Sequence, residues 1–482
     1  MEHCPVCNDL QRLPSYKEIT YDDLCGASAS GCSACSMLLQ GIQTYRYGNA
    51  SIDTLLLYGR PSSLEALGTS PLIVQVNKAN DTSDRLEFYR KPGTHSRWPD
   101  VGIGREISRH SSSNACFSLA RRWLQDCINN HAQCPGMRLS RLPTRRGLYA
   151  TLSHQWGSAI PLRLTTATID DLRRGIPASS LPKTFWDAVV IAQRLDIQYL
   201  WIDSLCIIQD DPLDWEKESS QMSEIYTNSA LTIAAGCASD CHSGCFSSRS
   251  DLDTYSVQVP VSVGLEPSFF VRCERTKPYP QANCSIEAGE RRTGLHSRAW
   301  VFQERLLASR TLHYTSTELA WECATGIACE CRFGFDESER HLAFKRAFVH
   351  PDLDLYGFFF RSLQAVSPSY AARIDKAQRR VVQSDQRKEE ISVAVQRHWE
   401  LVLYEYTARK LTVELDRLPA LSGIADAISR HTSKEYFFGL WSDEIVRGLL
   451  WRISDKFGEN ISRRMKEGYA PTWSWASVTG RI

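Results

Sequence analysis

The chain of 482 residues lacks the features that mark a secreted, membrane-spanning or nucleic-acid-binding protein. No apolar run is long enough to cross a bilayer, and the opening segment MEHCPVCNDLQRLPSYKEITYDD has no apolar core like that of a signal peptide. The formal net charge is +1, so no basic excess indicates binding to nucleic acid or to an anionic membrane. We therefore expect a protein with no membrane span and no nucleic-acid partner.

The motifs of several common enzyme classes are also missing. The sequence contains no GxxxxGK[ST] phosphate loop, no Gly-x-Ser-x-Gly turn and no glycine-rich dinucleotide fingerprint. His110, His242, His296 and His313 show no i,i+4 pairing and no His-Glu motif, so a metalloprotease has no support. These absences disfavour ATP-driven signalling and standard hydrolase chemistry.

Cysteine, in contrast, is abundant, with 17 residues. In a large chain without an export signal, most are expected to be reduced thiols or metal ligands. Cys4-x-x-Cys7 and Cys32-x-x-Cys35 have the paired spacing of a zinc knuckle or ribbon. A structural zinc ion would explain how so short a segment folds. Reduced structural thiols are the alternative, and the spacing leaves both open.

The length exceeds what one hydrophobic core usually holds, so two or three domains are expected. We divide the chain into a Cys-rich region at 1–140, an α/β core at 141–330 and a helical, Trp-rich region at 331–482. Residues 71–76 read as a strand, and most of 236–290 as loops. A long solvated helical stretch is predicted for 377–410, and the tryptophans are expected to be packing anchors.

The α/β core is predicted from a regular alternation of strand and helix patterns. Strands are expected at 148–154, 199–203 and 230–235, with helices at 181–195 and 212–227 between them. Short connections between such elements are typical of a parallel sheet with helices on its faces. A helix at 297–309 and two more strands, TLHY and ELAWEC, follow. The apolar segment YLWID at 199–203 is expected to be a fully buried strand.

The most informative stretch is 199–226, YLWIDSLCIIQDDPLDWEKESSQMSEIY. Its strand delivers Asp203 and Cys206 to the carboxyl end of the sheet, where open α/β sheets place ligands. Asp211 is expected to cap the next helix, on which Glu218 shares a stripe with apolar residues. Because a carboxylate on a core face is costly unless it is paired or used, Glu218 is the leading candidate for a functional residue.

Each candidate also has a structural interpretation. Glu218 either acts on a ribose as a charge stabiliser or general acid/base, or is a buried glutamate that is hydrogen-bonded to the backbone or paired with Arg298 or Arg305. Asp203 either orients a ligand or cation, or caps a helix and pairs with His154; the sequence does not decide between these.

Further candidates lie at the strand ends and on the later helix. Ser153, His154 and Trp156 follow the first strand and are expected to contact substrate. Cys206 with His154 and Asp203 suggests a nucleophilic triad, but a buried structural cysteine is the preferred interpretation. Gln303 and Glu304 share a helix face and either line the same site or are hydrogen-bonded core groups; we favour the latter. Both residues belong to the segment SRAWVFQERLLAS.

Several strings, in this order, resemble the fungal heterokaryon-incompatibility (HET) domain family. YATLSHQWG resembles its opening strand and turn, 181–235 resembles its central block, and SRAWVFQERLLASRTLHY with LAWEC resembles its closing block. The similarity is dense over 148–325 and sparser over 417–478, where LPALSGIA, FGLW and APTWSWAS occur.

The resemblance implies a cytoplasmic fungal protein of self/non-self recognition and programmed cell death, with protein partners or self-association. It also implies a distant relation to Toll/interleukin-receptor (TIR) domains, and so a TIR-like or flavodoxin-like core. Some TIR domains cleave NAD with a glutamate in a Trp-Cys-x-x-Glu context. The nearest counterpart here is Trp215-Glu216-Lys217-Glu218, one residue shorter and without the cysteine. The family's Tyr-Cys-Trp-Gly turn is also replaced, by His154-Gln155-Trp156-Gly157.

We therefore predict a HET-domain protein whose α/β core induces cell death or mediates recognition, with NAD-type glycosidic cleavage by Glu218 and Asp203 as its chemistry. A non-enzymatic interaction module is the alternative from another class. A tailoring enzyme of fungal secondary metabolism, using the same strand ends for acid/base chemistry, is the third.

Overall fold

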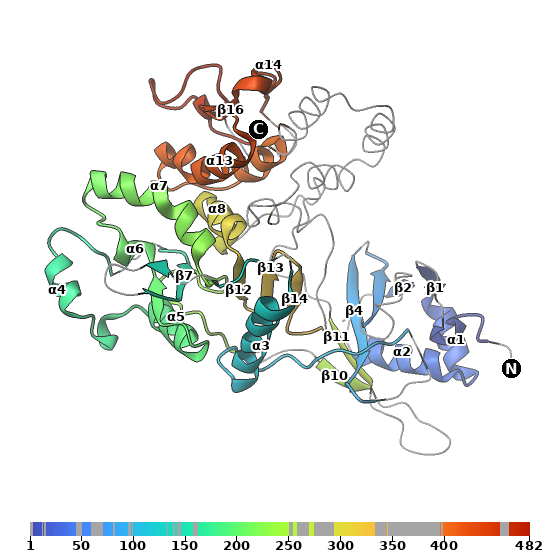
Figure 1. Cartoon of the computed structure of the whole chain (residues 1–482). Helices are drawn as coiled ribbons and strands as arrows, with labels where there is room; N and C mark the ends of the chain where they lie inside the picture. The colour runs from blue at the N-terminus through green and yellow to red at the C-terminus, as the bar shows by residue number, and fades with distance from the viewer. Residues whose placement is uncertain are drawn as a thin grey trace.

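The computed structural model describes residues 3–137, 140–332 and 396–482, together with Lys345. The positions inside these stretches that it does not describe are 12, 14–15, 45–50, 59–70, 81, 95–97, 99, 133, 142–145, 158–161, 250–253, 258–268, 274–293, 397–398 and 454–461. Most of the predicted helical stretch 377–410 lies outside the described residues, and its end is helical over 399–407. Figure 1 shows an N-terminal lobe at the right, a central α/β lobe and a C-terminal lobe above it.

The N-terminal lobe is a six-stranded antiparallel sheet packed against two helices, α1 (Tyr21–Ala29) and α2 (Ser33–Thr44). Its strands, in spatial order, are β1 (Lys17–Thr20), β2 (Ile52–Tyr58), β3 (Leu72–Lys78), β4 (Ser83–Arg90), β11 (Phe269–Cys273) and β10 (Thr254–Val257). Strand β3 confirms the strand predicted at 71–76. The prediction of loops over 236–290 is wrong at β10 and β11, because the chain returns from the central lobe to complete this sheet.

The central lobe contains the predicted α/β sheet. Its strands are β7 (Tyr149–Ser153), β8 (Tyr199–Trp201), β9 (Leu231–Ala235), β12 (Arg310–Tyr314), β13 (Leu319–Cys323) and β14 (Ile327–Cys329). The spatial order is β14-β13-β12-β9-β7-β8. The four strands from β8 to β12 are parallel, and β13 and β14 add an antiparallel hairpin. Numbered along the chain, the parallel strands take the order 2-1-3-4, as in flavodoxin-like sheets.

Strand β8 differs from the prediction. Its three residues, Tyr199, Leu200 and Trp201, are all half-buried, so the fully buried strand predicted at 199–203 is wrong. The reason is its place in the sheet, because β8 is the edge strand and has only β7 beside it. Asp203 does not extend the strand but begins a short helix, α6 (Asp203–Cys206).

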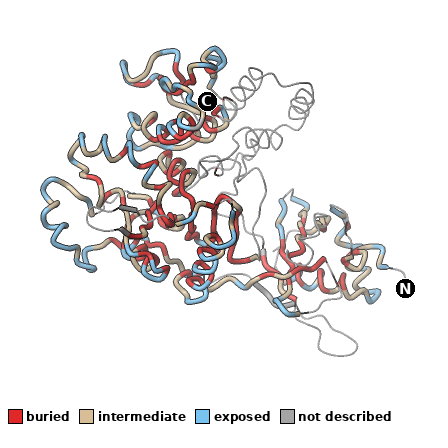
Figure 2. The backbone as a smooth tube through the Cα atoms, in the orientation of Figure 1, coloured by how far each residue is buried: buried red, intermediate tan, exposed pale blue. Residues whose placement is uncertain are grey.

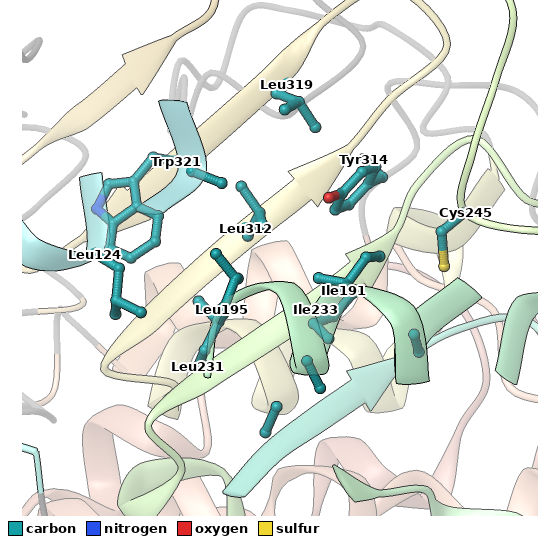
Figure 3. Packing of buried hydrophobic residues seen from close by; sticks show 14 of the residues in the cluster. Leu124, Ile191, Leu195, Leu231, Ile233, Cys245, Leu312, Tyr314, Leu319 and Trp321 are labelled. Atoms are coloured by element: carbon teal, nitrogen blue, oxygen red, sulfur yellow. The ribbon is translucent and has the colours of Figure 1, made fainter. Parts of the chain in front are cut away.

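One face of the central sheet is apolar. Side chains of Leu152, Ile233 and Leu312 pack there against α5 (Lys183–Arg194) and α3 (Asn114–Asn130), as Figure 3 shows in part. Alternate residues of a strand point to opposite faces, so one strand supplies both faces. Helix α3 precedes the predicted α/β region in sequence, yet it contributes to the same hydrophobic core.

The opposite face is polar although it is buried. Thr151 and Thr232 lie there side by side, with their hydroxyl oxygens 2.8 Å apart. Helices α7 (Pro212–Asn228) and α8 (Ala299–Leu307) belong to this side, where the Tyr226 hydroxyl of α7 reaches the Leu152 carbonyl. Buried polar groups need hydrogen-bond partners, so this face depends on a network rather than on apolar packing alone.

The C-terminal lobe packs around tryptophan, as predicted. Trp399, Trp441 and Trp475 are fully buried with α13 (Pro419–Thr432) in one cluster, which also includes residues of α8. The indole nitrogens of Trp399 and Trp475 donate to the carbonyl of Gly439 at 2.7 and 3.0 Å. Helix α14 (Ile445–Gly448) and the two-stranded pair β15 (Tyr436–Phe437) and β16 (Leu440–Trp441) complete the lobe.

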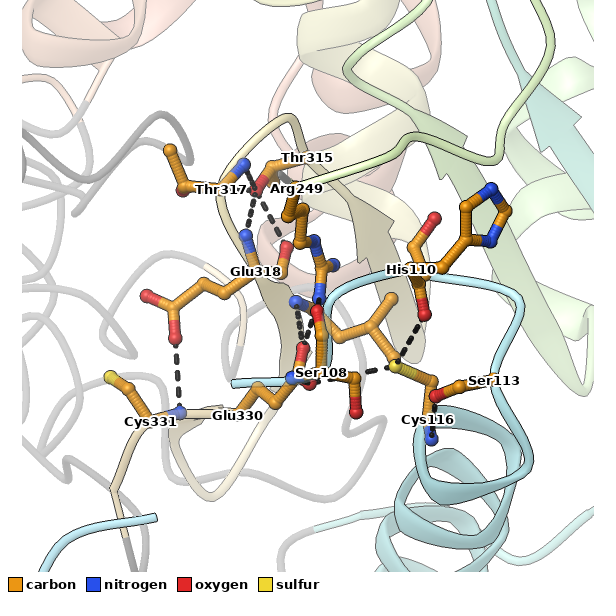
Figure 4. A network of polar contacts seen from close by, with 12 residues as sticks. Ser108, His110, Ser113, Cys116, Arg249, Thr315, Thr317, Glu318, Glu330 and Cys331 are labelled. Atoms are coloured by element: carbon orange, nitrogen blue, oxygen red, sulfur yellow. Dashed lines mark hydrogen bonds and ion pairs between the residues drawn. The ribbon is translucent and has the colours of Figure 1, made fainter. Parts of the chain in front are cut away.

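Buried polar contacts join the N-terminal lobe to the central lobe. Arg272 of β11 pairs with Glu87 of β4 at 2.6 Å and donates to the Cys331 carbonyl that follows β14. Arg249 pairs with Glu330 at 2.7 Å, inside the polar network of Figure 4. The tube in Figure 2 shows buried residues running through the central lobe and into both neighbours. Among the helices that the structure describes, none is both long and apolar enough to cross a membrane.

Candidate functional site

Polar side chains from four elements meet at the carboxyl ends of β7 and β8. We call them the strand-end cluster and define it as Ser153, His154, Trp156, Asp203, Tyr226, Arg298 and Glu304. Ser153 ends β7, and His154 and Trp156 follow it. Asp203 begins α6, Tyr226 belongs to α7, Arg298 precedes α8 at its N-cap, and Glu304 lies within α8. This is the end of the sheet at which open α/β folds bind ligands.

Asp203 is held in place by neighbours on both sides. Its Oδ2 accepts a hydrogen bond from the Trp156 indole nitrogen at 3.0 Å, and its Oδ1 accepts one from the backbone nitrogen of Ser204 at 2.7 Å. The His154 Nδ1 lies 3.9 Å from Oδ1, at the outer limit of an ion pair. The Asp203 side chain is 24% exposed, so this oriented carboxylate still reaches solvent.

His154 is buried and neutral. Burial lowers the pKa of its imidazole, an effect that the nearby Asp203 partly opposes and Arg298 reinforces. Its Nε2 has no hydrogen-bond partner among the described residues, and its ring meets Phe185 edge to face at 5.0 Å. Its backbone carbonyl accepts a hydrogen bond from Arg298, which ties the start of α8 to the end of β7.

Glu304 is the buried carboxyl group of the cluster. Burial raises its pKa from 4.5 to about 7, while the Arg298 cation and the nearby hydroxyls of Ser153 and Tyr226 act in the opposite direction. A carboxyl group with a pKa near 7 is able to take up or release a proton under physiological conditions. Sequence analysis placed Glu304 at the site but favoured a structural role for it.

Glu218 lies on α7 with 19% of its side chain exposed. Its partner is Lys217, whose Nζ donates at 2.8 Å, and neither of the arginines that the structural interpretation named. Arg305 instead pairs with Glu322 at 2.7 Å. Glu218 is close enough to Cys206 to act on its thiol, as Asp203 also does. Asp203 begins α6, and Glu218 lies on α7, the next helix along the chain.

Cys206 does not fit the role of a nucleophile. Burial raises the pKa of its thiol to about 11, with Asp203 and Glu218 adding to the effect. The reactive form of cysteine is the thiolate, which is scarce at neutral pH under these conditions. This agrees with the structural interpretation that the sequence favoured.

Gln303 points away from the strand-end cluster. Its Oε1 accepts a hydrogen bond from the backbone nitrogen of Gly423 at 2.9 Å, so it ties α8 to α13. A Cβ added at Gly423 would lie 2.5 Å from the Ser223 Cβ and 2.8 Å from the Gln303 Oε1. The three helices therefore meet at a point that only glycine permits.

The turn after β7 has a structural role as well. The Gln155 side chain donates to the Ala238 carbonyl at 2.9 Å, and Gly157, at φ +74°, packs against Asp240. Both contacts join the loop after β7 to the loop after β9, across the point where the strand order reverses. Gln155 thus joins the two loops.

The four N-terminal cysteines also come together. The Cys4 and Cys35 sulfurs are 3.8 Å apart, those of Cys7 and Cys32 are 3.6 Å apart, and all four lie within 4.8 Å of one another. The backbone nitrogen of Cys35 points to the Cys32 sulfur at 3.5 Å. A tetrahedral zinc ion with Zn–S bonds of about 2.3 Å separates its sulfurs by about 3.8 Å, so this donor set suits zinc.

Sequence analysis did not predict several residues that the structure brings together. Tyr226 was assigned only to the apolar stripe of its helix. A second group of metal-type donors, Cys127, His131, Cys134 and Cys323, was missed. The C-x3-H-x2-C spacing of its first three members was a visible signal, but Cys323 is 192 residues from His131.

Comparison with known proteins finds a family match within the central lobe. No curated protein and no solved structure matches the chain. Residues 149–304, from β7 into α8, match the family model described as Heterokaryon incompatibility protein (HET). The match confirms the resemblance carried by the sequence strings and connects the chain with heterokaryon incompatibility, a form of self/non-self recognition. Residues 149–304 of this chain are therefore assigned to the HET domain family.

Proposed function

We propose that this protein acts in self/non-self recognition and cell-death signalling by cleaving the glycosidic bond of an NAD-type nucleotide at the strand-end cluster. The observation that carries the proposal is the presence of Asp203 and Glu304 in the strand-end cluster, where they act on each other electrostatically, while Glu218 on α7 acts with Asp203 on the Cys206 thiol. We also propose that this activity belongs to the fungal cytoplasm and that self-association or a protein partner triggers it.

The chemistry assigns a separate task to each carboxyl group. When the bond between ribose and the cationic nicotinamide ring breaks, its electron pair neutralises the ring, and positive charge develops on the ribose. Glu218 stabilises that charge, and Asp203, fixed by Trp156, orients a ribose hydroxyl. Water then attacks the ribose carbon, and a carboxylate such as Glu304, with its pKa near 7, accepts the released proton.

A non-enzymatic interaction module is the second candidate. Two observations favour it: the Trp156–Asp203 hydrogen bond and the Gln303–Gly423 hydrogen bond both connect elements of the fold. In this case the polar residues specify packing, and the exposed surface of the lobe would carry recognition.

The test is NAD turnover by the full chain, at high protein concentration with a crowding agent. Glu218→Gln and Asp203→Asn are compared with Glu224→Gln, a matched change at an exposed glutamate of the same helix. Turnover that is retained in Glu224→Gln and lost in folded Glu218→Gln supports the enzyme. No turnover in the wild type, under conditions where it self-associates, supports the interaction module.

We also propose that Cys4, Cys7, Cys32 and Cys35 bind one structural zinc ion in the N-terminal lobe. Cys7 and Cys35 are fully buried in the core of that lobe, so the ion would join the first turn to the start of α2. Zinc content measured by mass spectrometry should fall by one ion per chain in Cys7→Ser. Cys25→Ser, on α1 and outside the donor set, is the matched control.

A further inference from the structure

We infer that Cys127, His131, Cys134 and Cys323 form a second zinc site, which fastens α3 to the edge of the HET-domain sheet. The inference does not depend on the proposed NAD chemistry or on the N-terminal zinc. Cys127 lies in the last turn of α3, His131 and Cys134 follow that helix, and Cys323 ends β13. The ligands thus come from both sides of the segment matched by the HET family.

The donor atoms have the separations that a tetrahedral ion requires. The His131 Nδ1 lies 3.4 Å from the Cys323 sulfur and 3.9 Å from the Cys134 sulfur, and all four donors lie within 4.8 Å of one another. Bonds of about 2.3 Å to sulfur and 2.0–2.1 Å to nitrogen place tetrahedral donors about 3.5–3.8 Å apart. All three cysteines are buried and none forms a disulfide.

The histidine is oriented for this role. Its Nδ1 faces the sulfurs, and its Nε2 lies 3.5 Å from the Asp126 carboxylate. A zinc-bound histidine commonly donates its other ring N–H to a carboxylate, which fixes the ring and its tautomer. Asp126 and His131 therefore reproduce the carboxylate–histidine–zinc arrangement.

A buried arginine supplies an independent observation. Arg310 is 1% exposed, and no carboxylate pairs with it among the residues the structure describes. Its Nε instead donates to the Cys127 sulfur at 3.2 Å, and its Nη2 donates to the Pro135 carbonyl. A buried charge is costly unless an opposite charge compensates it. Zn²⁺ with three thiolates and a neutral imidazole carries a charge of −1, which would balance the Arg310 cation.

The position of the site indicates a structural ion. Arg310 and Cys323 are paired across β12 and β13, at the start of β12. The parallel strands begin at this end of the sheet, whereas the strand-end cluster lies at the other end. With four protein ligands the ion has no open position for a substrate, as in other structural zinc sites.

The test measures zinc and cobalt(II) binding by the full chain. A Cys4→Ser/Cys7→Ser variant removes the N-terminal donors and leaves the second site intact, so we expect it to retain one zinc ion per chain. Adding Cys134→Ser should remove that ion, whereas adding Cys116→Ser should not, because Cys116 is a buried cysteine of α3 outside the donor set. Cobalt(II) bound to the first variant should give the strong visible absorption of tetrahedral thiolate coordination.

If Cys134→Ser does not fold, replacing the His131 ligand with other residues tests the same inference. In the same background, His131→Cys retains four donors and should keep the ion with a shifted cobalt(II) spectrum, whereas His131→Ala should weaken binding at least tenfold. The inference is overturned if the folded Cys4→Ser/Cys7→Ser variant holds no zinc, or if zinc content is unchanged by Cys134→Ser. An unchanged cobalt(II) spectrum in His131→Cys would also overturn it.

Discussion

Replacing Glu304 with glutamine should change how the stability of the protein depends on pH. The pKa of this buried carboxyl group is raised from 4.5 to about 7 by burial, so folding favours its neutral form. This stabilisation is complete below pH 4.5 and is lost as the pH rises through about 7. At about 1.4 kcal/mol for each pH unit, the full effect is on the order of 3 kcal/mol.

Glutamine resembles the neutral acid in shape but cannot ionise. Between pH 5 and pH 8 the free energy of unfolding of Glu304→Gln should therefore rise by about 2–3 kcal/mol relative to the wild type. Urea unfolding followed by tryptophan fluorescence at several pH values measures this difference. Glu224→Gln, at an exposed position on α7, controls for the loss of one carboxylate.

The result that would refute the reasoning is a constant difference between Glu304→Gln and the wild type across this pH range. It would mean that Glu304 is ionised in the folded protein at pH 5, stabilised by Arg298 and its hydroxyl neighbours against the effect of burial. The assignment of Glu304 as a proton acceptor near neutral pH would then fail as well.

Three further changes test the packing of the lobes by urea unfolding. Gly423→Ala should destabilise the protein by about 1–3 kcal/mol, because the added Cβ would lie 2.5 Å from the Ser223 Cβ. An unchanged urea midpoint of unfolding would contradict the close approach of α13 and α7. Glu330→Gln should lower the free energy of unfolding by about 3–5 kcal/mol, since it leaves Arg249 buried without its counter-charge. An unchanged free energy of unfolding would show that this ion pair does not stabilise the fold. Trp321→Ala should lower the free energy of unfolding by about 3–5 kcal/mol, because it replaces a large, fully buried side chain with a small one. A loss below about 1 kcal/mol would show that neighbouring side chains of the apolar face move to fill the space.

Local patterns were sufficient to predict the central α/β lobe. The strands at 148–154 and 230–235 are short, apolar and followed or preceded by turn residues, and they correspond to β7 and β9. The cap at Asp211 is confirmed, since its carboxylate accepts hydrogen bonds from the backbone nitrogens of Leu213 and Asp214. Such signals depend on neighbours within one or two turns, which is why the sequence reports them directly.

Features that depend on distant segments were not predictable in this way. The composition of YLWID gives no sign that β8 is an edge strand, because the strand order decides how many neighbours it has. Strands β10 and β11 join a sheet whose other members lie nearly 170 residues or more earlier in the chain, as the 185-residue separation of Glu87 and Arg272 illustrates.

The same limit applies to the candidate site. The sequence predicted that Ser153, His154, Trp156 and Asp203 would come together, because the ends of adjacent parallel strands meet at one edge of a sheet. It did not predict that Tyr226 and Arg298 act on Glu304, since those contacts depend on how α7 and α8 lie over the sheet. The catalytic roles of Asp203 and Glu218 stay predictions.

The limits of the HET match do not coincide with the limits of a fragment that would keep its hydrophobic core. Residues 149–304 contain β7, β8 and β9 but neither α3 nor β12, although Leu312 of β12 and several residues of α3 share their apolar core. A fragment cut at those limits would open the edge of β9 to other chains and uncover Ile233, and both are conditions for aggregation. A transplant that preserves the core has to run from the start of α3 to the end of β14, residues 114–329.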